Sequence, residues 1–369
     1  MKLFLSLALF AAFLLCPTAC ADGVREGLSL AAVQALPALF PFFVVSGLLV
    51  RCDTARLSPL LAKPLARLYG LPPEAVSALV LGLIGGYPVG AATACTLLSE
   101  GVLSREAAER VNRFCNCASP GFCIGLVGLG VFGSAQAGAM LYGIHIVSAL
   151  IVGLCFARTP LSALSQRIHN RNRTSFPSVF CASVQQAAST ALTVTAFLTM
   201  FSILLRLLSP FFALLPYGNV LDGMIELTNG LDELTVLTLP RRTRLTLASF
   251  LLGFGGLAVQ FQVRALAEAH DLPVRGLFAA KLLHGTLAAV LTAFLFSLSP
   301  AVLTVSSPEL TPLTSECPAM IGTVPVYACC AVRFRFVSNL GVEKAQEMIY
   351  NILYTSCIHR HHSTGHFYH

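Results

Sequence analysis

Long apolar runs, separated by short polar turns, fill the chain between residues 28 and 299. Three of them reach the roughly 20 residues that a helix needs to cross a bilayer: Leu28–Val50, Phe180–Leu208 and Leu277–Leu298. No stretch before Ser306 is polar enough to build a soluble domain. The pattern therefore predicts an all-α polytopic membrane protein with one membrane domain, surrounded by the lipid bilayer.

Composition supports the membrane class. Hydrophobic residues make up 56% of the chain and charged residues 11%, against about 25% charged residues in an average soluble domain. We expect no nucleic-acid partner. Residues 1–21, with Lys2 before an apolar run and Ala19-Cys20-Ala21 at its end, fit either a cleaved signal peptide or a first membrane helix, and we favour the helix.

The charge distribution predicts a topology. No acidic residue occurs between Glu109 and Asp222, whereas the loop 158–175 is rich in arginine. By the positive-inside rule this loop faces the cytoplasm, and the basic segments 51–67 and 105–113 face it too. A single crossing helix over 75–98 would place its two basic flanks on opposite sides. We therefore predict a re-entrant hairpin there.

Glycine and proline mark the turn of this hairpin, at Gly85, Gly86, Tyr87, Pro88 and Gly90. They release backbone groups that lipid cannot satisfy, and transporters bind solutes at such breaks. The alternative is that small residues only let helices pack closely.

A second glycine pair, Gly255 and Gly256, precedes its next turn by nearly the same spacing as Gly85 and Gly86. The match predicts two related, inverted repeats, residues 28–157 and 180–299, each with a glycine-rich broken or re-entrant helical hairpin. The alternative is a chance likeness of two helical hairpins. Gln260 follows the second pair and suits either a neutral polar solute or an interhelical hydrogen bond.

Other polar residues in apolar sequence are candidates for the same site. Glu226 lies in a region, 210–244, that is either a crossing helix or an external amphipathic segment. Asn229, three residues on, would share its helix face. Asn112 and Asn116 also share a helix face, and Ser119-Pro120 then interrupts that helix. The interrupted end either cradles a solute or is only a cap and a kink. His145 and His284 are packing residues or proton relays.

Enzyme and metal chemistry lack sequence support. There is no His-Glu-x-x-His pair and no Gly-x-Ser-x-Gly elbow. The thirteen cysteines include no zinc-ribbon spacing. We expect no catalytic residue, metal or cofactor. The tail 306–369 is mixed and rich in histidine without ordered ligand spacing, and we predict low order for it.

Several motifs occur in a characteristic order: Pro37-Ala-Leu-Phe-Pro-Phe42, Gly85-Gly-Tyr-Pro-Val-Gly90, Arg113-Phe-Cys-Asn116, Ser119-Pro-Gly121, Glu226-Leu-Thr-Asn-Gly230 and Gly253-Phe-Gly-Gly256. Together they resemble the sporulation integral membrane proteins of the YlbJ type, whose repeated unit is the nucleoside recognition or Gate domain. The resemblance implies a multi-pass protein of the bacterial cell membrane that is needed for spore maturation. It also implies distant similarity to concentrative nucleoside transporters.

Two functions follow as expectations. The first is a transporter or channel for a small polar, nucleoside-like solute. The second is a non-transporting factor that supports spore envelope assembly through other sporulation membrane proteins. For the first, the predicted solute-binding residues are Gly85, Gly86, Tyr87, Pro88, Gly90, Asn112, Asn116, Glu226, Thr228, Asn229, Gly255, Gly256 and Gln260.

Overall fold

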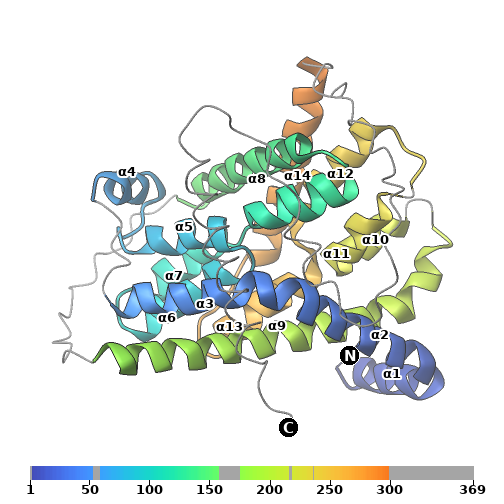
Figure 1. Ribbon diagram of the computed structural model, residues 1–369, viewed down its shortest axis with the longest axis horizontal. Helices are drawn as coiled ribbons and strands as arrows, with labels where there is room; N and C mark the ends of the chain where they lie inside the picture. The colour runs from blue at the N-terminus through green and yellow to red at the C-terminus, as the bar shows by residue number, and fades with distance from the viewer. Residues whose placement is uncertain (1, 53–58, 158–174, 216–217, 236, 299–369) are drawn as a thin grey trace, which may run out of the picture. The chain divides into compact units, whose positions relative to one another are not determined.

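The structure is a computed structural model, and it describes residues 2–52, 59–157, 175–215, 218–235 and 237–298 (Figure 1). Its regular elements there are all helices. Within this part of the chain, five helical stretches are long and apolar enough to cross a membrane: Pro17–Arg51, Ala135–Cys155, Phe176–Phe212, Arg241–Glu268 and Leu277–Ser297. The predicted all-α polytopic class is confirmed.

The first half of the described chain contains two long helical spans and several short elements. Its helices are α1 (Lys2–Leu15), α2 (Pro17–Leu30), the π-helix η1 (Ala31–Ala35), α3 (Leu36–Arg51), α4 (Pro59–Tyr69), α5 (Ala75–Gly85), α6 (Val89–Ser99), α7 (Arg105–Asn112), the π-helix η2 (Gly121–Val131) and α8 (Ala135–Cys155). The second half contains α9 (Phe176–Phe212), α10 (Gly218–Ile225), α11 (Leu227–Glu233), α12 (Arg241–Phe254), α13 (Gly256–Glu268) and α14 (Leu277–Leu298).

With α1 and α4 left aside, helices of similar kind follow one another in a similar order in the two halves, and the inverted repeats stay a prediction. A long helix (α2 to α3, or α9) is followed by a helical hairpin (α5 and α6, or α10 and α11). An interrupted helix comes next (α7 and η2 around residues 113–120, or α12 and α13), and a long helix, α8 or α14, ends each half. The two long helices α3 and α9 lie side by side (Figure 1).

The predicted hairpin at the first glycine pair is present, because α5 and α6 pack against each other. The second glycine pair differs from the expected hairpin. Gly255 interrupts a single 28-residue span, Arg241–Glu268, and α13 continues toward the opposite end. The hairpin of the second half is instead α10 and α11, with Glu226 at its tip. The equal spacing of the two glycine pairs therefore matched elements of different kinds, a hairpin at Gly85 and Gly86 and an interrupted helix at Gly255 and Gly256.

Close backbone approach explains the glycines of both hairpins. A Cβ atom at Gly82 would lie 1.9 Å from the Cys115 carbonyl oxygen, and one at Gly90 would lie 2.3 Å from it. In the second hairpin a Cβ at Gly230 would lie 1.9 Å from the Gly223 Cα. Any side chain here would collide with backbone, so the hairpins hold their tips only because these positions lack one.

Three arginines of the segment 105–113 bind backbone carbonyls at one end of the membrane domain. Arg105 Nη1 donates to the Asp271 carbonyl at 2.9 Å, and Arg113 Nε donates to the Arg275 carbonyl at 2.9 Å. Arg110 Nη1 donates to the Gly70 carbonyl at 3.0 Å. The turns after α4, α6 and α13 therefore share this end. Arg241, Arg242 and Arg244 begin α12 at the other end of the span, and the cytoplasmic side of the basic segments stays a prediction.

Some predictions concern other parts of the chain. Residues 2–15 form α1, and whether residues 1–21 are removed stays a prediction. Most of the basic loop 158–175 and the whole tail 306–369 lie outside the described residues.

Candidate functional site at the meeting point of the helix breaks

The tip of the first hairpin reaches the end of α12. Gly86 has a φ of 89°, a left-handed backbone that glycine adopts without strain. The next residue, Tyr87, donates its hydroxyl hydrogen to the Leu252 carbonyl. Residue 252 lies in the last turn of α12, where carbonyl groups lose their helical partners. The tyrosine therefore ties the hairpin tip to the interrupted span.

The break between α12 and α13 contacts both hairpin tips. Gly255 and Gly256 have φ values of 78° and 70°. A Cβ atom at Gly255 would lie 3.4 Å from Lys281 Cε and 3.5 Å from the Tyr87 ring. A Cβ at Gly256 would lie 3.1 Å from the Leu227 nitrogen, at the tip of the second hairpin. This break and both hairpin tips therefore meet in the interior.

Six polar side chains surround this meeting point, and each is at most 9% exposed. We call them the central polar cluster: Tyr87, Asn112, Asn116, His145, Lys281 and His284. They come from the first hairpin, from α7 and the stretch after it, from α8 and from α14. Polar side chains this deeply buried are costly unless their hydrogen bonds are made.

Lys281 occupies the middle of the cluster. Its Nζ donates to the Asn116 carbonyl oxygen at 2.9 Å and lies 3.5 Å from His284 Nδ1. It also lies 5.1 Å from the centroid of the Tyr87 ring, in a cation–π position. Among the described residues no carboxylate lies within 4.0 Å of this ammonium group. Lys281 is thus a buried cation held by neutral groups.

The two histidines form a short chain of hydrogen bonds. His284 Nε2 lies 3.0 Å from the His145 carbonyl oxygen, and the two rings stack with centroids 4.5 Å apart. His145 Nε2 accepts the Ala118 N–H at 2.9 Å. A neutral ring that accepts through Nε2 carries its hydrogen on Nδ1. That Nδ1 is buried and has no partner.

Asn116 joins the interruption after α7 to the first hairpin. Its Oδ1 accepts the Ala91 N–H at 2.9 Å, and its Nδ2 donates to the Asn112 carbonyl at 2.8 Å. Backbone groups released at both breaks are therefore satisfied by one amide side chain. The Asn112 Nδ2 group is buried and has no partner.

Glu226 lies at the tip of the second hairpin and is 2% exposed. Its Oε2 accepts the Asn229 N–H at 2.9 Å, so the carboxylate caps α11. The predicted pair on one helix face is not formed, because Glu226 precedes the helix.

The predicted residues divide into two groups. Gly85, Gly86, Tyr87, Pro88, Gly90, Asn112, Asn116 and Gly255 belong to the first tip and the two interruptions, whereas Glu226, Thr228, Asn229 and Gly256 belong to the second tip. Gln260 donates to the Phe254 carbonyl at 3.2 Å and so satisfies the end of α12. The region 210–244 is neither a crossing helix nor an external amphipathic segment, because its hairpin is buried at Glu226.

Sequence reasoning missed Lys281. The signal was available, since this residue is a single charge in the apolar run of α14. Ionisable side chains within membrane segments are rare and usually mark function. His145 and His284 were weighed as packing residues or relays, and the structure places both in the cluster.

The contact between Tyr87 and α12 can be tested by removing one hydroxyl. Tyr87→Phe should lower the free energy of unfolding by about 1 kcal/mol, because the Leu252 carbonyl loses its donor. The measurement is the thermal unfolding midpoint of detergent-purified protein. Tyr142→Phe is the matched control, since Tyr142 donates to the Leu83 carbonyl but is only partly buried. An equal or larger effect at Tyr142 would contradict the tip contact.

Comparison with known proteins finds a similar membrane protein. The chain is 29% identical over 320 residues to the sporulation integral membrane protein YlbJ of Bacillus subtilis (strain 168). The match covers 76% of this chain and 78% of that relative. The chain is thus similar, over most of its length, to a membrane protein of the YlbJ type. No family model matches it, and no solved structure does. The multi-pass membrane location predicted from the sequence is confirmed.

Proposed function

We propose that this YlbJ-type protein serves sporulation by binding and moving a small polar, nucleoside-like solute where the helix breaks meet. One observation carries the proposal: two hairpin tips and the interrupted helices converge on a buried polar cluster. Irregular backbone at membrane depth is tolerated where it is buried in protein or lines a path for solute. The relative's name supports the link to sporulation.

Unused hydrogen-bond donors indicate what the solute offers. Asn112 Nδ2, His145 Nδ1 and Asn229 Nδ2 are buried without partners. Buried polar groups are normally satisfied, so such donors suit a ligand or water that accepts hydrogen bonds. Ribose hydroxyls and base edges carry several acceptors within a small volume. A nucleoside-like solute would therefore satisfy donors around both tips.

The two hairpins suggest how the solute passes. The first hairpin begins and ends at the end of the domain that carries Arg105 and Arg110, and its tip points inward. The second hairpin meets the same break through Gly256. Displacing one hairpin at a time would expose the meeting point to one side only. This is the geometry that alternating access requires.

Flux through proteoliposomes tests the proposal. Purified wild-type protein should take up at least one member of a panel of nucleosides and small polar metabolites in a saturable manner. Glu226→Gln should reduce that flux at least tenfold, because the amide can keep the cap on α11 through its one oxygen but loses the negative charge and the second acceptor oxygen that a solute could use. Glu268→Gln, a change at an exposed pair with Arg264, should leave flux unchanged. No flux for any solute would overturn the transport proposal.

The second candidate function is a non-transporting factor for spore envelope assembly. Its support is the closed packing of the site, where protein groups satisfy most of the released backbone groups. For that function Glu226→Gln should be tolerated. A host that lacks its own YlbJ-type protein should then form as many mature spores with the variant as with the wild type.

A further inference from the structure

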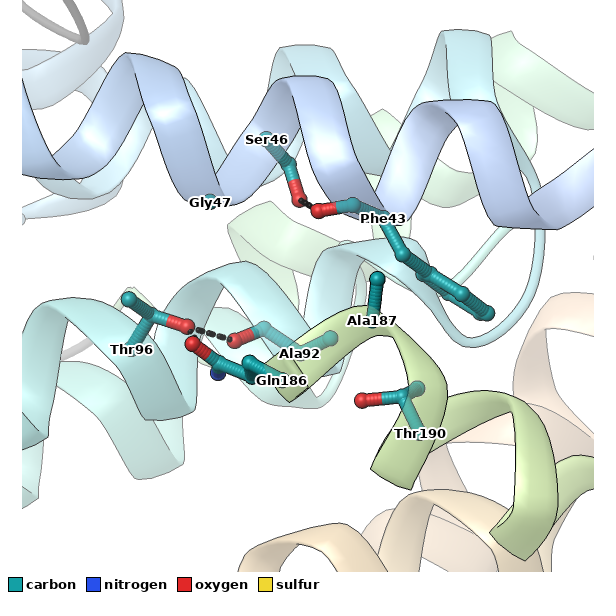
Figure 2. A pocket seen from close by; sticks show the side chains of 8 residues that line it. All are labelled: Phe43, Ser46, Gly47, Ala92, Thr96, Gln186, Ala187 and Thr190. Carbon is teal, nitrogen blue, oxygen red and sulfur yellow. Dashed lines mark hydrogen bonds between the residues drawn. The ribbon is translucent and has the colours of Figure 1, made fainter. Parts of the chain in front are cut away.

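A second polar site lies apart from the central polar cluster, between α3, α6 and α9. Figure 2 shows the pocket, which is lined by Phe43, Ser46, Gly47, Ala92, Thr96, Gln186, Ala187 and Thr190. Its free space takes about one water molecule. On α3 the pocket lies in the C-terminal half of the helix, which ends at Arg51. A ligand here must therefore be monatomic or nearly so.

Most hydrogen bonds around the pocket are already made. Gln186 Nε2 donates to Thr96 Oγ1 at 2.6 Å, and Thr96 Oγ1 donates to the Ala92 carbonyl at 2.8 Å. Ser46 Oγ donates to the Phe43 carbonyl at 3.1 Å. These bonds join α6 to α9 and fix the walls. The pocket is thus a formed site and not a loose gap.

One wall residue lacks a partner. Thr190 is 4% exposed, and its hydroxyl makes no hydrogen bond within the described residues. The other threonines of α9 at 193, 195 and 199 donate to carbonyls of the preceding turn. Figure 2 shows the Thr190 hydroxyl turned toward the space beside Gln186. A buried hydroxyl without a partner is a donor available to a ligand.

An arginine with one unused donor lies at the edge of the pocket. Arg51 Nη2 donates to Gln186 Oε1 at 2.6 Å, and Arg51 Nε lies 3.4 Å from Glu100 Oε1. The third nitrogen of this guanidinium, Nη1, is buried without a partner. It lies 3.2 Å from the point where a Cβ of Gly47 would stand. Glu100 balances part of the Arg51 charge, and the unpartnered Nη1 leaves a charged donor next to the pocket wall at Gly47, which favours an anion over a cation.

We propose that this pocket binds a chloride-sized monovalent anion. The Thr190 hydroxyl and the Gln186 amide would donate to it, and the unpartnered Nη1 of Arg51 would supply a charged donor. The ion would join α3 to α9 beside the wall that α6 forms. The site is independent of any solute bound at the central polar cluster.

Thermal unfolding of purified protein tests the site. Wild type should unfold at a higher temperature in potassium chloride than in potassium gluconate of equal ionic strength, with a saturable dependence on chloride, and bromide should substitute. Thr190→Val keeps the shape and removes the hydroxyl, so it should weaken the apparent chloride affinity at least tenfold. Thr193→Val, on an exposed face of the same helix, should keep the wild-type response.

Two results would overturn the proposal. The first is a wild type whose unfolding temperature is the same in chloride and gluconate. This result would mean that the pocket holds water and not an anion. The second is an unchanged chloride response in Thr190→Val. If Thr190→Val does not fold, Thr190→Ala, which also removes the hydroxyl, should show the same loss of chloride dependence. An unchanged response there would also contradict the site.

Discussion

Lys281→Met should abolish function while leaving the protein folded and more stable than the wild type. Met has a similar length but cannot donate to the Asn116 carbonyl, and leaving that group unsatisfied costs about 1–3 kcal/mol. Removing a buried cation that lacks a carboxylate partner relieves an effective penalty of several kcal/mol. The second effect is larger. Solute flux and the yield of mature spores should both fall at least 100-fold.

The control is Lys63→Met, because Lys63 is exposed on α4. It should behave as the wild type in flux, spore yield and unfolding. The unfolding midpoint shows whether a loss of activity in Lys281→Met comes from a functional role of the lysine or from unfolding of the protein. If Lys281→Met keeps full activity, the lysine only packs the break, and the central polar cluster is not a solute site.

Gly82→Ala should prevent folding of the membrane domain. The new Cβ would lie 1.9 Å from the Cys115 carbonyl oxygen, which is backbone and is held by the stretch between α7 and η2. Relief would require α5 to move away from that stretch, and overpacking of this kind costs typically about 1–3 kcal/mol or more. We expect loss of monodisperse protein on size-exclusion chromatography after detergent extraction.

Gly143→Ala provides the comparison. Gly143 lies in α8, and a Cβ there would meet nothing within 4 Å. Since alanine is about 1 kcal/mol better than glycine in a helix interior, this variant should be neutral or slightly stabilised. Normal yield of Gly82→Ala would show that α5 does not approach the Cys115 backbone as described.

Charge and apolar length were sufficient to predict the class of fold and the first hairpin. Basic residues flank residues 75–98 on both sides, and a helix cannot return to its own side without a turn. Gly86 and Pro88 then located that turn within one or two residues of its observed place. Both inferences depend only on short-range sequence and on the bilayer.

The second half was predicted less well for a physical reason. A glycine pair permits a left-handed break, but it does not decide whether the chain turns back or continues. That choice depends on what packs beyond the break, and α13 packs on α6 and α9. Glu226 gave no hairpin signal, because its role as a helix cap needs a tip that only the packed structure defines.

The central polar cluster also depends on long-range packing. Asn116 and Lys281 are 165 residues apart, and no local pattern brings them together. The roles of His145 and His284 likewise follow from the contact between α8 and α14. Sequence alone could have singled out Lys281 as a charge in an apolar span, but not its partners.

Photo-crosslinking with an azido-nucleoside tests most directly whether a solute binds where the breaks meet. Purified protein would be irradiated with the probe, digested and analysed by peptide mass spectrometry, with and without excess unlabelled nucleoside. We expect crosslinks that the unlabelled nucleoside suppresses, within residues 85–90, 226–229 and 255–260, and their loss in Lys281→Met. Crosslinks confined to other helices, or labelling that excess nucleoside does not reduce, would contradict the assignment of the solute site to the meeting point of the helix breaks.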